Sequence, residues 1–353
     1  MKENQILSPE AVSDLLLWYR NNRRDLPWRR TKDPYCIWVS EIMLQQTRVE
    51  AVKPYYARFM SALPSVQALA EVSEERLLKL WEGLGYYSRA RNLQKAAKEI
   101  VSLYDGELPC SYDQLRRLPG IGDYTAGAIA SIAFDERVPA IDGNVLRVLA
   151  RVSGSYEDIM LPQTKKSMRS SLAEVVPTEA GDFTQSLIEL GATVCVPNGE
   201  AKCAQCPLAS VCVAAREHLT DELPVRSAKK PRRIEKRTVF LILDDNRAVL
   251  HHRPQKGLLA GLFEPPNTEG HLDKTQATAY LRSIGFEPLR LERIEDSKHI
   301  FTHIEWHMQA YRVWISPEFD GVDEENGYFL IGREELGRDL AIPSAFVAYR
   351  KYL

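Results

Sequence analysis

A dense group of cysteines near residue 200 restricts the fold of this chain more than any other feature. Four of the six cysteines fall within eighteen residues, in a C-x7-C-x2-C-x5-C array made of Cys195, Cys203, Cys206 and Cys212. A reducing compartment disfavours three disulfides, and thiolates this close in sequence are typical of a bound metal, either zinc or an iron-sulfur cluster. The spacing leaves both open, although one CxxC pair flanked by two lone cysteines favours a cluster. Cys36 and Cys110 are predicted to be packing residues.

The length of the chain indicates more than one domain. Its 353 residues are enough for two or three cores, and 44% hydrophobic with 27% charged residues is an ordinary globular composition. No run of eighteen apolar residues occurs, and the first ten residues lack the apolar core of a signal peptide. We therefore expect a cytoplasmic protein.

Charge is informative only locally. The net charge of −2 neither indicates nor excludes a nucleic-acid partner, because phosphate binding needs only a basic face. Residues 226–237, RSAKKPRRIEKR, hold seven basic residues and one acid. This segment is either a solvated linker or a DNA-contacting segment.

The predicted secondary structure changes at this basic segment. The first ~225 residues consist of amphipathic helical stretches, for example one that begins with Ser8 as N-cap and Pro9 at the first helical position. Beyond the segment, residues 238–243, 248–251 and 307–315 have strand character. A helix is expected at 274–285, between strands. The chain is thus predicted to be mostly α first and α+β afterwards.

A glycine-rich turn at Leu118–Gly122, LPGIG, separates two helical stretches. Glycines at these positions imply that something approaches the backbone closely. A turn of this kind that opens a helix presents free N–H groups at the positive end of the helix dipole, which suits a phosphate or an intervening cation. The alternative is an ordinary connection between two helices.

Two acids stand in apolar surroundings. Asp142 follows VPAI and precedes a helical stretch, so it either caps that helix or faces a site. Glu41 lies in CIWVSEIML, where burial would raise its pKa and keep it protonated near neutral pH. The alternative for Glu41 is a place in the first turn of a helix that begins after Ser40.

Together these segments resemble the helix-hairpin-helix DNA glycosylase superfamily, and more closely its MutY-type adenine glycosylases. The resemblance covers residues ~20–215 and rests on the cysteine array and on four strings, WVSEIMLQQTRV, LWEGLGYYSRARNL, LPGIGDYTAGAIA and AIDGNVLRVLARV. One departure is the first cysteine interval, which encloses seven residues instead of the family's six. The C-terminal third resembles the Nudix-like domain of the same glycosylases.

The resemblance implies a fold and cofactors. We expect a multidomain protein with a mostly-α helix-hairpin-helix core and an iron-sulfur cluster loop, followed by an α+β Nudix-like domain. The implied boundaries are a catalytic domain at 1–225 (hairpin subdomain 28–135, cluster subdomain 1–27 plus 136–225), a basic linker at 226–237 and the Nudix-like domain at 238–353. The implied cofactors are one 4Fe-4S cluster on the four clustered cysteines and a monovalent or divalent cation at the hairpin turn.

The implied activity is hydrolysis of the N-glycosidic bond of adenine paired with 8-oxoguanine or guanine in double-stranded DNA, after base flipping. Glu41 would protonate the adenine, Asp142 would stay ionised and stabilise the sugar cation, and Tyr124 and Asn144 would orient the site. Related bifunctional enzymes have a lysine where this chain has Tyr124, so no efficient strand cleavage is expected. An enzyme that removes thymine from G·T pairs and an iron-sulfur electron carrier are the competing hypotheses.

The resemblance also implies DNA-binding residues. Around the orphaned partner base it implies Gln46, Leu84 and Tyr86, and at the pocket wall or a phosphate Arg29 and, like it, Arg30. At the hairpin it implies Gly120 and Gly122. Phe301, Thr302 and His303 match a Phe-Ser-His lesion-reading loop, with threonine replacing serine. A monomer associated with the nucleoid is expected.

The Nudix-like part raises a rival activity. A Nudix hydrolase holds magnesium with an REUxEE set, where U is aliphatic, but residues 261–286 contain no such cluster of glutamates. This domain is therefore predicted to bind and read DNA rather than to cleave a pyrophosphate.

Overall fold

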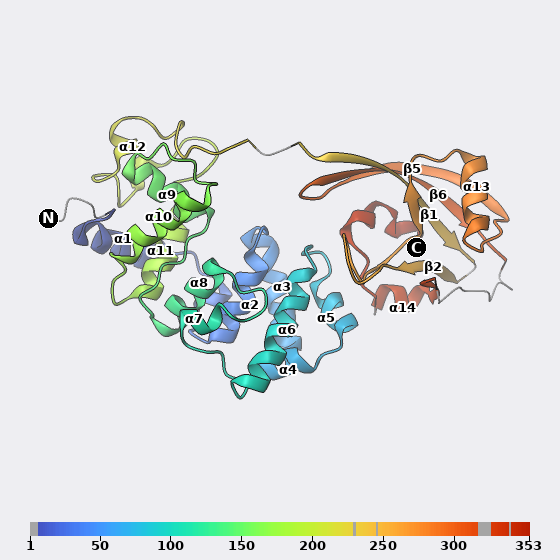
Figure 1. The fold of residues 1–353 in the computed structure, drawn as a ribbon, viewed down its shortest axis with the longest axis horizontal. Helices are drawn as coiled ribbons and strands as arrows, with labels where there is room; N and C mark the ends of the chain where they lie inside the picture. Colours follow the sequence, from blue (N-terminus) through green and yellow to red (C-terminus); the bar gives the residue numbers. More distant parts are fainter. Residues whose placement is uncertain (1–5, 229–230, 245, 317–325, 339) are drawn as a thin grey trace. The chain divides into compact units, whose positions relative to one another are not determined.

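The computed structural model describes residues 6–228, 231–244, 246–316, 326–338 and 340–353. The chain divides into two compact units, Met1–Glu71 with Arg91–Ala228, and Val72–Ala90 with Lys229–Leu353 (Figure 1). Residues 72–90 thus group with the C-terminal residues, which the sequence does not predict. In the described parts of the chain, no helix has the length and hydropathy needed to cross a membrane.

The first unit is helical. Its helices are α1 (Pro9–Asn22), η1 (Pro27–Arg29), α2 (Pro34–Leu44), α3 (Val49–Ala62), α4 (Val66–Glu71), most of α6 (Ser88–Leu103), α7 (Tyr112–Leu115), α8 (Asp123–Phe134), α9 (Gly143–Ser153), α10 (Pro162–Ala173), α11 (Ala180–Thr193), η2 (Cys203–Gln205) and α12 (Val213–Arg216). The expected start of α1 is confirmed, because the Ser8 hydroxyl accepts a hydrogen bond from the backbone N–H of Ala11.

Helix α11 is the central support of this unit. It packs against α1, α8 and α9, and its apolar residues join one buried core with those of α1 and α9. Gly191 permits the approach to α9, because a Cβ there would lie 2.6 Å from the Cβ of Asn144. Gly127 of α8 similarly lies against the carbonyl of Pro139. The N-terminal ends of α8 and α9 are therefore fixed by tight packing.

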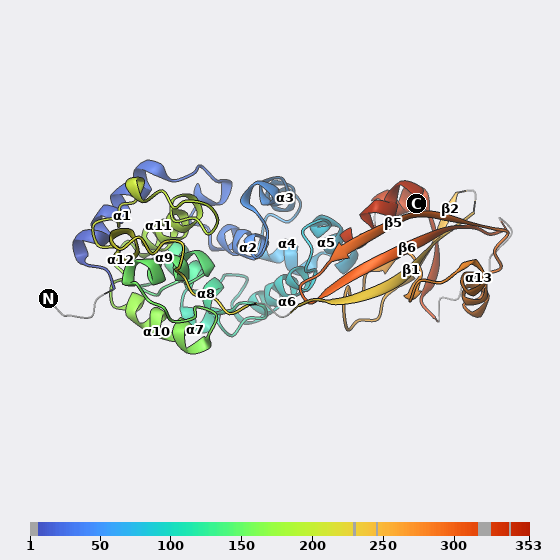
Figure 2. The same cartoon turned by 90° about the horizontal axis from the view of Figure 1, so that it is seen from above.

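The second unit contains a seven-stranded sheet and helix α5 (Glu74–Trp81). The strand order is β3-β2-β1-β6-β5, with β4 paired to β1 and β7 to β2. Figure 2 shows the long strands β1, β6 and β5 of this sheet. The strands are β1 (Arg233–Leu243), β2 (Arg247–His252), β3 (Phe263–Glu264), β4 (Asn267–Glu269), β5 (Arg290–Ile300), β6 (Ile304–Trp314) and β7 (Tyr328–Gly332). The other helices are α13 (Lys274–Ser283), α14 (Arg333–Arg338) and η3 (Ser344–Tyr352).

Alternate residues of β1 enter two different cores. Phe240 and Ile242 pack with α13, whereas Val239 and Leu241 pack with η3. This alternation is what a strand buried on both faces requires. The helix expected at 274–285 is confirmed, and Asp273 and Gln276 form a capping box at its start.

The structure corrects two local predictions. Residues 226–237 are not wholly a linker, because β1 begins at Arg233 and pairs in parallel with β6, beginning opposite Ile304. Lys229 and Lys230 of the predicted linker lie outside the described residues. Cys110 is exposed and therefore is not a packing residue, while Cys36 is half-buried.

Candidate active site

One cavity of about 1050 Å³ in the helical unit is lined by both of the predicted catalytic acids. Glu41 comes from α2, Tyr124 from the start of α8, and Asp142 and Asn144 from the start of α9. Arg29 and Gln46 also line it. Residues as far apart in sequence as Arg29 and Asn144 are thus brought to one cavity.

Glu41 is a buried acid at the end of α2. The helix begins at Pro34, with Asp33 as its N-cap, so the alternative that Glu41 occupies the first turn of a helix is wrong. The Tyr124 hydroxyl donates a hydrogen bond of 2.7 Å to Oε2 of Glu41. The pKa of Glu41 is raised to about 7, mainly by burial; the hydrogen bond from Tyr124 lowers it, and the nearby Asp142 raises it. Glu41 can therefore donate a proton near neutral pH.

Asp142 is held differently, because it is both the N-cap of α9 and part of the cavity wall. Its Oδ1 accepts hydrogen bonds of 2.8 Å from the backbone N–H groups of Asn144 and Val145, and its Oδ2 accepts one of 2.7 Å from Asn144 Nδ2. Burial raises the pKa of Asp142, while these three hydrogen bonds lower it. The two alternatives left open by the sequence, a cap or a site residue, are thus compatible.

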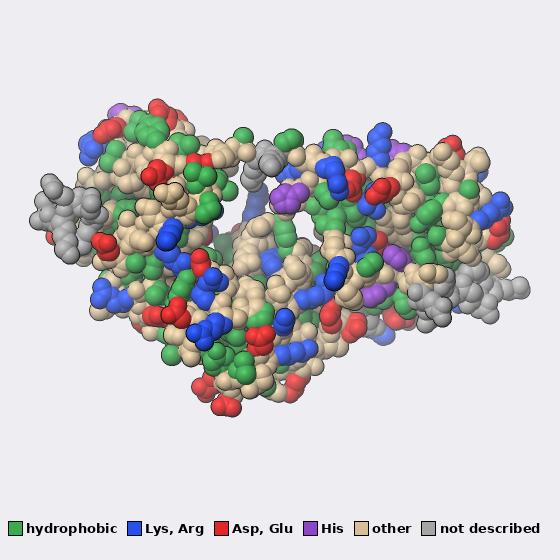
Figure 3. Space-filling view, in the orientation of Figure 1, with side chains coloured by type: hydrophobic (Ala, Val, Ile, Leu, Met, Phe, Trp, Pro, Cys, Tyr) green, Lys and Arg blue, Asp and Glu red, His purple; other side chains and the backbone are tan. Residues whose placement is uncertain are grey.

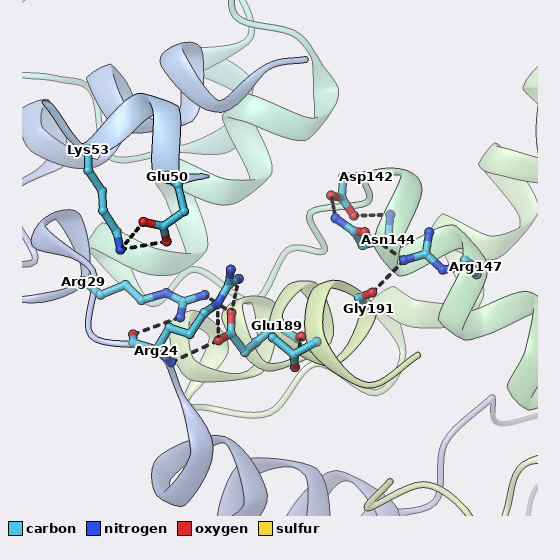
Figure 4. Close-up of polar contacts among 10 residues, drawn as sticks. Arg24, Arg29, Glu50, Lys53, Asp142, Asn144, Arg147, Glu189 and Gly191 are labelled. Atoms are coloured by element: carbon cyan, nitrogen blue, oxygen red, sulfur yellow. Dashed lines mark hydrogen bonds and ion pairs between the residues drawn. The ribbon is translucent and has the colours of Figure 1, made fainter. Parts of the chain in front are cut away.

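A network of ion pairs around the buried Glu189 lies beside the cavity (Figure 4). No role for Glu189 is predicted from the sequence. Glu189 of α11 has a fully buried carboxylate that accepts hydrogen bonds from Arg24 at 2.8 and 2.7 Å and from Arg29 at 2.8 Å. Burial alone would raise the pKa of Glu189, but the two arginines lower it to about 2. Arg29 therefore lies at the cavity wall as predicted, with its guanidinium directed to Glu189. Arg30 is exposed and pairs with Asp25.

A second buried arginine links Asp142 to the cysteine loop. Arg147 donates hydrogen bonds to Asn144 Oδ1 at 2.9 Å and to the carbonyl of Gly191 at 2.7 Å (Figure 4). It also donates to the carbonyl of Cys195 at 2.8 Å. Because Asn144 in turn donates to Asp142, the position of Asp142 depends on the backbone around Cys195. The basic residue within the apolar string NVLRVLA was the available sequence signal.

Only one of the two predicted glycines of the hairpin turn lies where a side chain could not fit. Gly120 has a φ of +76°, and a Cβ there would lie 2.7 Å from the Cβ of Asn92. Gly122 has a negative φ of −85°, and no described atom lies near the position of a Cβ. The protein itself thus requires glycine at 120 but not at 122. Gly122 is the N-cap of α8, where the chain presents free N–H groups.

Basic side chains surround this turn. Figure 3 shows lysine and arginine side chains gathered over the face that carries α7, α8 and α10. Arg116 and Arg117 beside the turn and Lys165 and Lys166 of α10 are exposed. Phosphate binding needs a local concentration of positive charge of this kind.

The four clustered cysteines line one mostly apolar cavity, together with residues of α9 and α11. Arg151 donates a hydrogen bond of 3.2 Å to the sulfur of Cys195. Burial and the neighbouring thiols raise the pKa of Cys206 to about 12. In the described residues, however, no three or more His, Cys, Asp or Glu side chains form a group that could hold a single metal ion.

The residues expected to meet the orphaned base differ in exposure. In the first unit Gln46 is exposed at the cavity, with a positive φ of 58°. In the second unit Tyr86 is 47% exposed, with a φ of 47°, whereas Leu84 is only 6% exposed. The side chain of Leu84, which the resemblance assigns to the space around the orphaned base, is thus buried in this structure without DNA, and its assignment stays a prediction.

Phe301, Thr302 and His303 form the turn between β5 and β6, as the hairpin interpretation requires. Phe301 packs edge-on against Trp306 at 4.9 Å between ring centroids, and so belongs to the core beneath the turn. Thr302 and His303 are exposed. Thr302 Oγ1 lies 2.8 Å from the hydroxyl of Tyr86, which belongs to the same unit.

Comparison with known proteins defines the class. Residues 39–178 match the HhH-GPD superfamily of base excision DNA repair proteins, and residues 238–351 match the NUDIX domain. A thermostable thymine-DNA glycosylase of known structure aligns with a TM-score of 0.53 and 28% identity, covering 58% of this chain and 95% of that one. The chain is therefore a helix-hairpin-helix repair glycosylase with a C-terminal Nudix-like domain, and the predicted fold class is confirmed.

Relatives of known name narrow the class to one family. The adenine DNA glycosylase of Mus musculus is 36% identical over 359 residues, covering 85% of this chain and 69% of its own length. That of Buchnera aphidicola from Acyrthosiphon pisum is 30% identical over 344 residues, covering 96% and 97%. The chain spans 65% of the Homo sapiens relative, which is 35% identical. This chain belongs to the adenine DNA glycosylase family, whose members are glycosidases of base excision repair.

Proposed function

We propose that this enzyme hydrolyses the N-glycosidic bond of adenine that lies opposite 8-oxoguanine or guanine in duplex DNA. The observation that carries the proposal is the cavity in which a protonatable Glu41 and a hydrogen-bonded Asp142 occur together. Because a base within a duplex is inaccessible, the adenine must be flipped out to reach this cavity.

The two acids have complementary roles in the proposed reaction. Glu41 donates its proton to the imidazole-ring nitrogen of adenine that does not carry the sugar. The electrons of the N-glycosidic bond then leave with the neutral base, and positive charge develops on the sugar. Asp142, fixed by donors from Asn144 and Val145, stabilises that charge, and water adds to the sugar while Glu41 recovers a proton.

The same site disfavours strand cleavage. A lyase of this superfamily needs an amine that forms an imine with the opened sugar, and the corresponding place is occupied by Tyr124. The Tyr124 hydroxyl is engaged with Glu41, and its pKa is raised well above the ordinary value, mainly by burial. We therefore propose a monofunctional enzyme without efficient lyase activity.

Reading of the oxidised base is assigned to Tyr86, Thr302 and His303. Oxidation converts one ring-nitrogen acceptor of guanine into an N–H donor and adds a carbonyl at the neighbouring carbon. A threonine hydroxyl can accept from that N–H, and a histidine can donate to the carbonyl or to a phosphate. The exposure of Thr302 and His303 supports this assignment, whereas Phe301 acts from beneath by supporting the turn.

We propose that the cysteine cavity holds a 4Fe-4S cluster rather than one zinc ion. Four thiolates around zinc, at about 2.3 Å, would lie within roughly 4 Å of one another. A cluster distributes its ligands over several iron atoms and so accommodates thiols that share a cavity without converging on one point. We propose that Cys195, Cys203, Cys206 and Cys212 hold the cluster and that, when bound, it fixes the loop to which Arg147 is tied.

DNA binding is assigned to the hairpin and its basic surroundings, where a cation at the turn would add to the attraction of Arg116 and Arg117 for phosphates. We also propose that the enzyme acts as a monomer in the cytoplasm, associated with the nucleoid.

Single-turnover release of bases from three duplexes tests the proposal. These hold adenine opposite 8-oxoguanine, adenine opposite guanine, and thymine opposite guanine. We expect release of adenine from the first two, faster from the first, and no release of thymine. Release of thymine alone would instead support the activity named for the thermostable thymine-DNA glycosylase.

A further inference from the structure

Glu82 is an acid at a place where a helix alone would not favour one. It follows directly on the last residue of α5, Trp81, where the carbonyl end of the helix dipole repels negative charge. Its side chain is nevertheless only 14% exposed. The contacts that compensate for this position must come from other groups.

Those groups belong largely to the C-terminal segment of the same unit. Glu82 Oε1 accepts a hydrogen bond of 3.0 Å from the backbone N–H of Ile342 and pairs with the guanidinium of Arg350. Lys79 lies 3.0 Å from Glu82 Oε2 and donates to the carbonyl of Leu340 at 2.9 Å. Arg350 also donates to the carbonyl of Ile342 at 3.0 Å. We name these five residues the clasp.

The C-terminal side of the clasp leads to Thr302 through packed aromatic residues. Ile342 shares a buried core with Trp306 and Phe346, whose rings are 6.1 Å apart. Phe301 packs on Trp306 in the same core and directly precedes Thr302. The position of the Thr302 turn is therefore coupled to the segment that Glu82 binds.

The α5 side of the clasp leads to Tyr86 through a short, tightly bonded turn. Arg89 donates to the carbonyls of Leu84 and Gly85 at 2.9 and 3.1 Å, and Trp81 Nε1 donates to the carbonyl of Gly85 at 3.2 Å. The guanidinium of Arg89 also lies over the ring of Tyr86, 5.6 Å from its centroid. Glu82 lies between Trp81 and Leu84 in the chain, so the place of its backbone is coupled to the turn that carries Tyr86.

The contact between Tyr86 and Thr302 closes this ring of interactions. An exposed hydroxyl pair exchanges readily with water, so it cannot by itself hold two loops together. We propose that Glu82 is a positioning residue that holds Tyr86 against Thr302 and thereby sets the preference for adenine opposite 8-oxoguanine over adenine opposite guanine. This inference rests on the lesion-reading role proposed above for Tyr86 and Thr302.

The test compares single-turnover adenine release from the two adenine-containing duplexes at one salt concentration. For Glu82→Ala and for Arg350→Gln we expect the ratio of the two rates to fall by about tenfold, within the range of one base-pair discrimination. The rate opposite guanine should stay close to that of the parent. Glu82→Gln keeps an acceptor for Ile342 and should be intermediate. Glu287→Ala, which breaks an exposed pair with Arg282 in the same unit, is the matched control and should leave the ratio unchanged.

Coupling to the hydroxyl contact separates positioning from general stabilisation. In a Tyr86→Phe background, which lacks the hydroxyl, Glu82→Ala should lower the ratio no further. Independent, multiplicative effects would overturn the proposal, as would an unchanged ratio in both clasp variants, or equal losses on both duplexes. A parent enzyme that releases adenine from neither duplex would instead refute the proposed function itself.

Discussion

The rate of adenine release should fall at alkaline pH, because Glu41 then loses the proton that it donates. Burial raises its pKa from 4.5 to about 7, so about half of the molecules carry the protonated acid at pH 7. A glutamate of pKa 4.5 would be protonated in about one molecule in 300 at that pH. The site thus increases the available acid by about two orders of magnitude, and the rate should fall tenfold per pH unit well above pH 7.

Tyr124→Phe should shift the pH above which the rate falls, because it removes the hydrogen bond to Glu41. The hydroxyl donates to the carboxylate of Glu41, which stabilises the ionised form and lowers the pKa. Removing the hydroxyl therefore raises the pKa of Glu41. A hydrogen bond to a charged group contributes about 1.5–3 kcal/mol, which corresponds to about one to two pH units. The alkaline limb of Tyr124→Phe should move to higher pH by that amount.

The assay is single-turnover adenine release opposite 8-oxoguanine between pH 5.5 and 9.5 at constant ionic strength. Tyr112→Phe, which removes a hydroxyl bonded to Asp123 outside the cavity, is the control and should keep the parent profile. A parent rate that stays constant up to pH 9, or a limb that moves to lower pH in Tyr124→Phe, would refute this reasoning.

Three further predictions concern the cluster, the chemistry and the buried network. Cys206→Ser should lower the bound iron and sulfide and the unfolding temperature, and elemental analysis that finds only zinc would contradict the cluster. Borohydride should trap little covalent DNA adduct, because Tyr124 cannot form an imine; a high yield through a lysine would argue against a monofunctional enzyme. Glu189→Gln should lower the free energy of unfolding at pH 7 by about 3 kcal/mol, since its pKa falls from 4.5 to about 2 on folding. That difference should be complete above pH 4.5 and vanish as the pH falls through about 2; equal denaturation midpoints at pH 7 would exclude it.

The sequence predicted those features that local patterns determine. Ser8 and Pro9 mark the start of a helix, and a run of β-branched, aromatic and aliphatic residues at 238–243 marks β1. The string around Asp142 predicts a cap because the relevant hydrogen bonds span only three residues. For Glu41 the apolar neighbours correctly indicated burial. The helix that carries it starts earlier than expected, at Pro34 with Asp33 as its N-cap.

Long-range pairing could not be predicted in the same way. Glu189 and Arg24 are 165 residues apart, and nothing local distinguishes a buried acid with two cationic partners from an acid on a helix surface. The grouping of Tyr86 with Thr302 depends equally on contacts across 216 residues. For Leu84 the resemblance assigns a place near the orphaned base, but the sequence does not predict that its side chain is buried in the free protein.

The central claim is that Asp142 stabilises the sugar cation as adenine departs, and Asp142→Asn tests it most directly. The substitution keeps one side-chain oxygen as the acceptor for the backbone N–H groups of Asn144 and Val145 at the start of α9. It removes the charge and the acceptor of the hydrogen bond from Asn144 Nδ2. We predict that single-turnover adenine release opposite 8-oxoguanine slows by on the order of a hundredfold or more while the duplex is still bound. Release by the variant at close to the parent rate, with binding intact, would contradict the account.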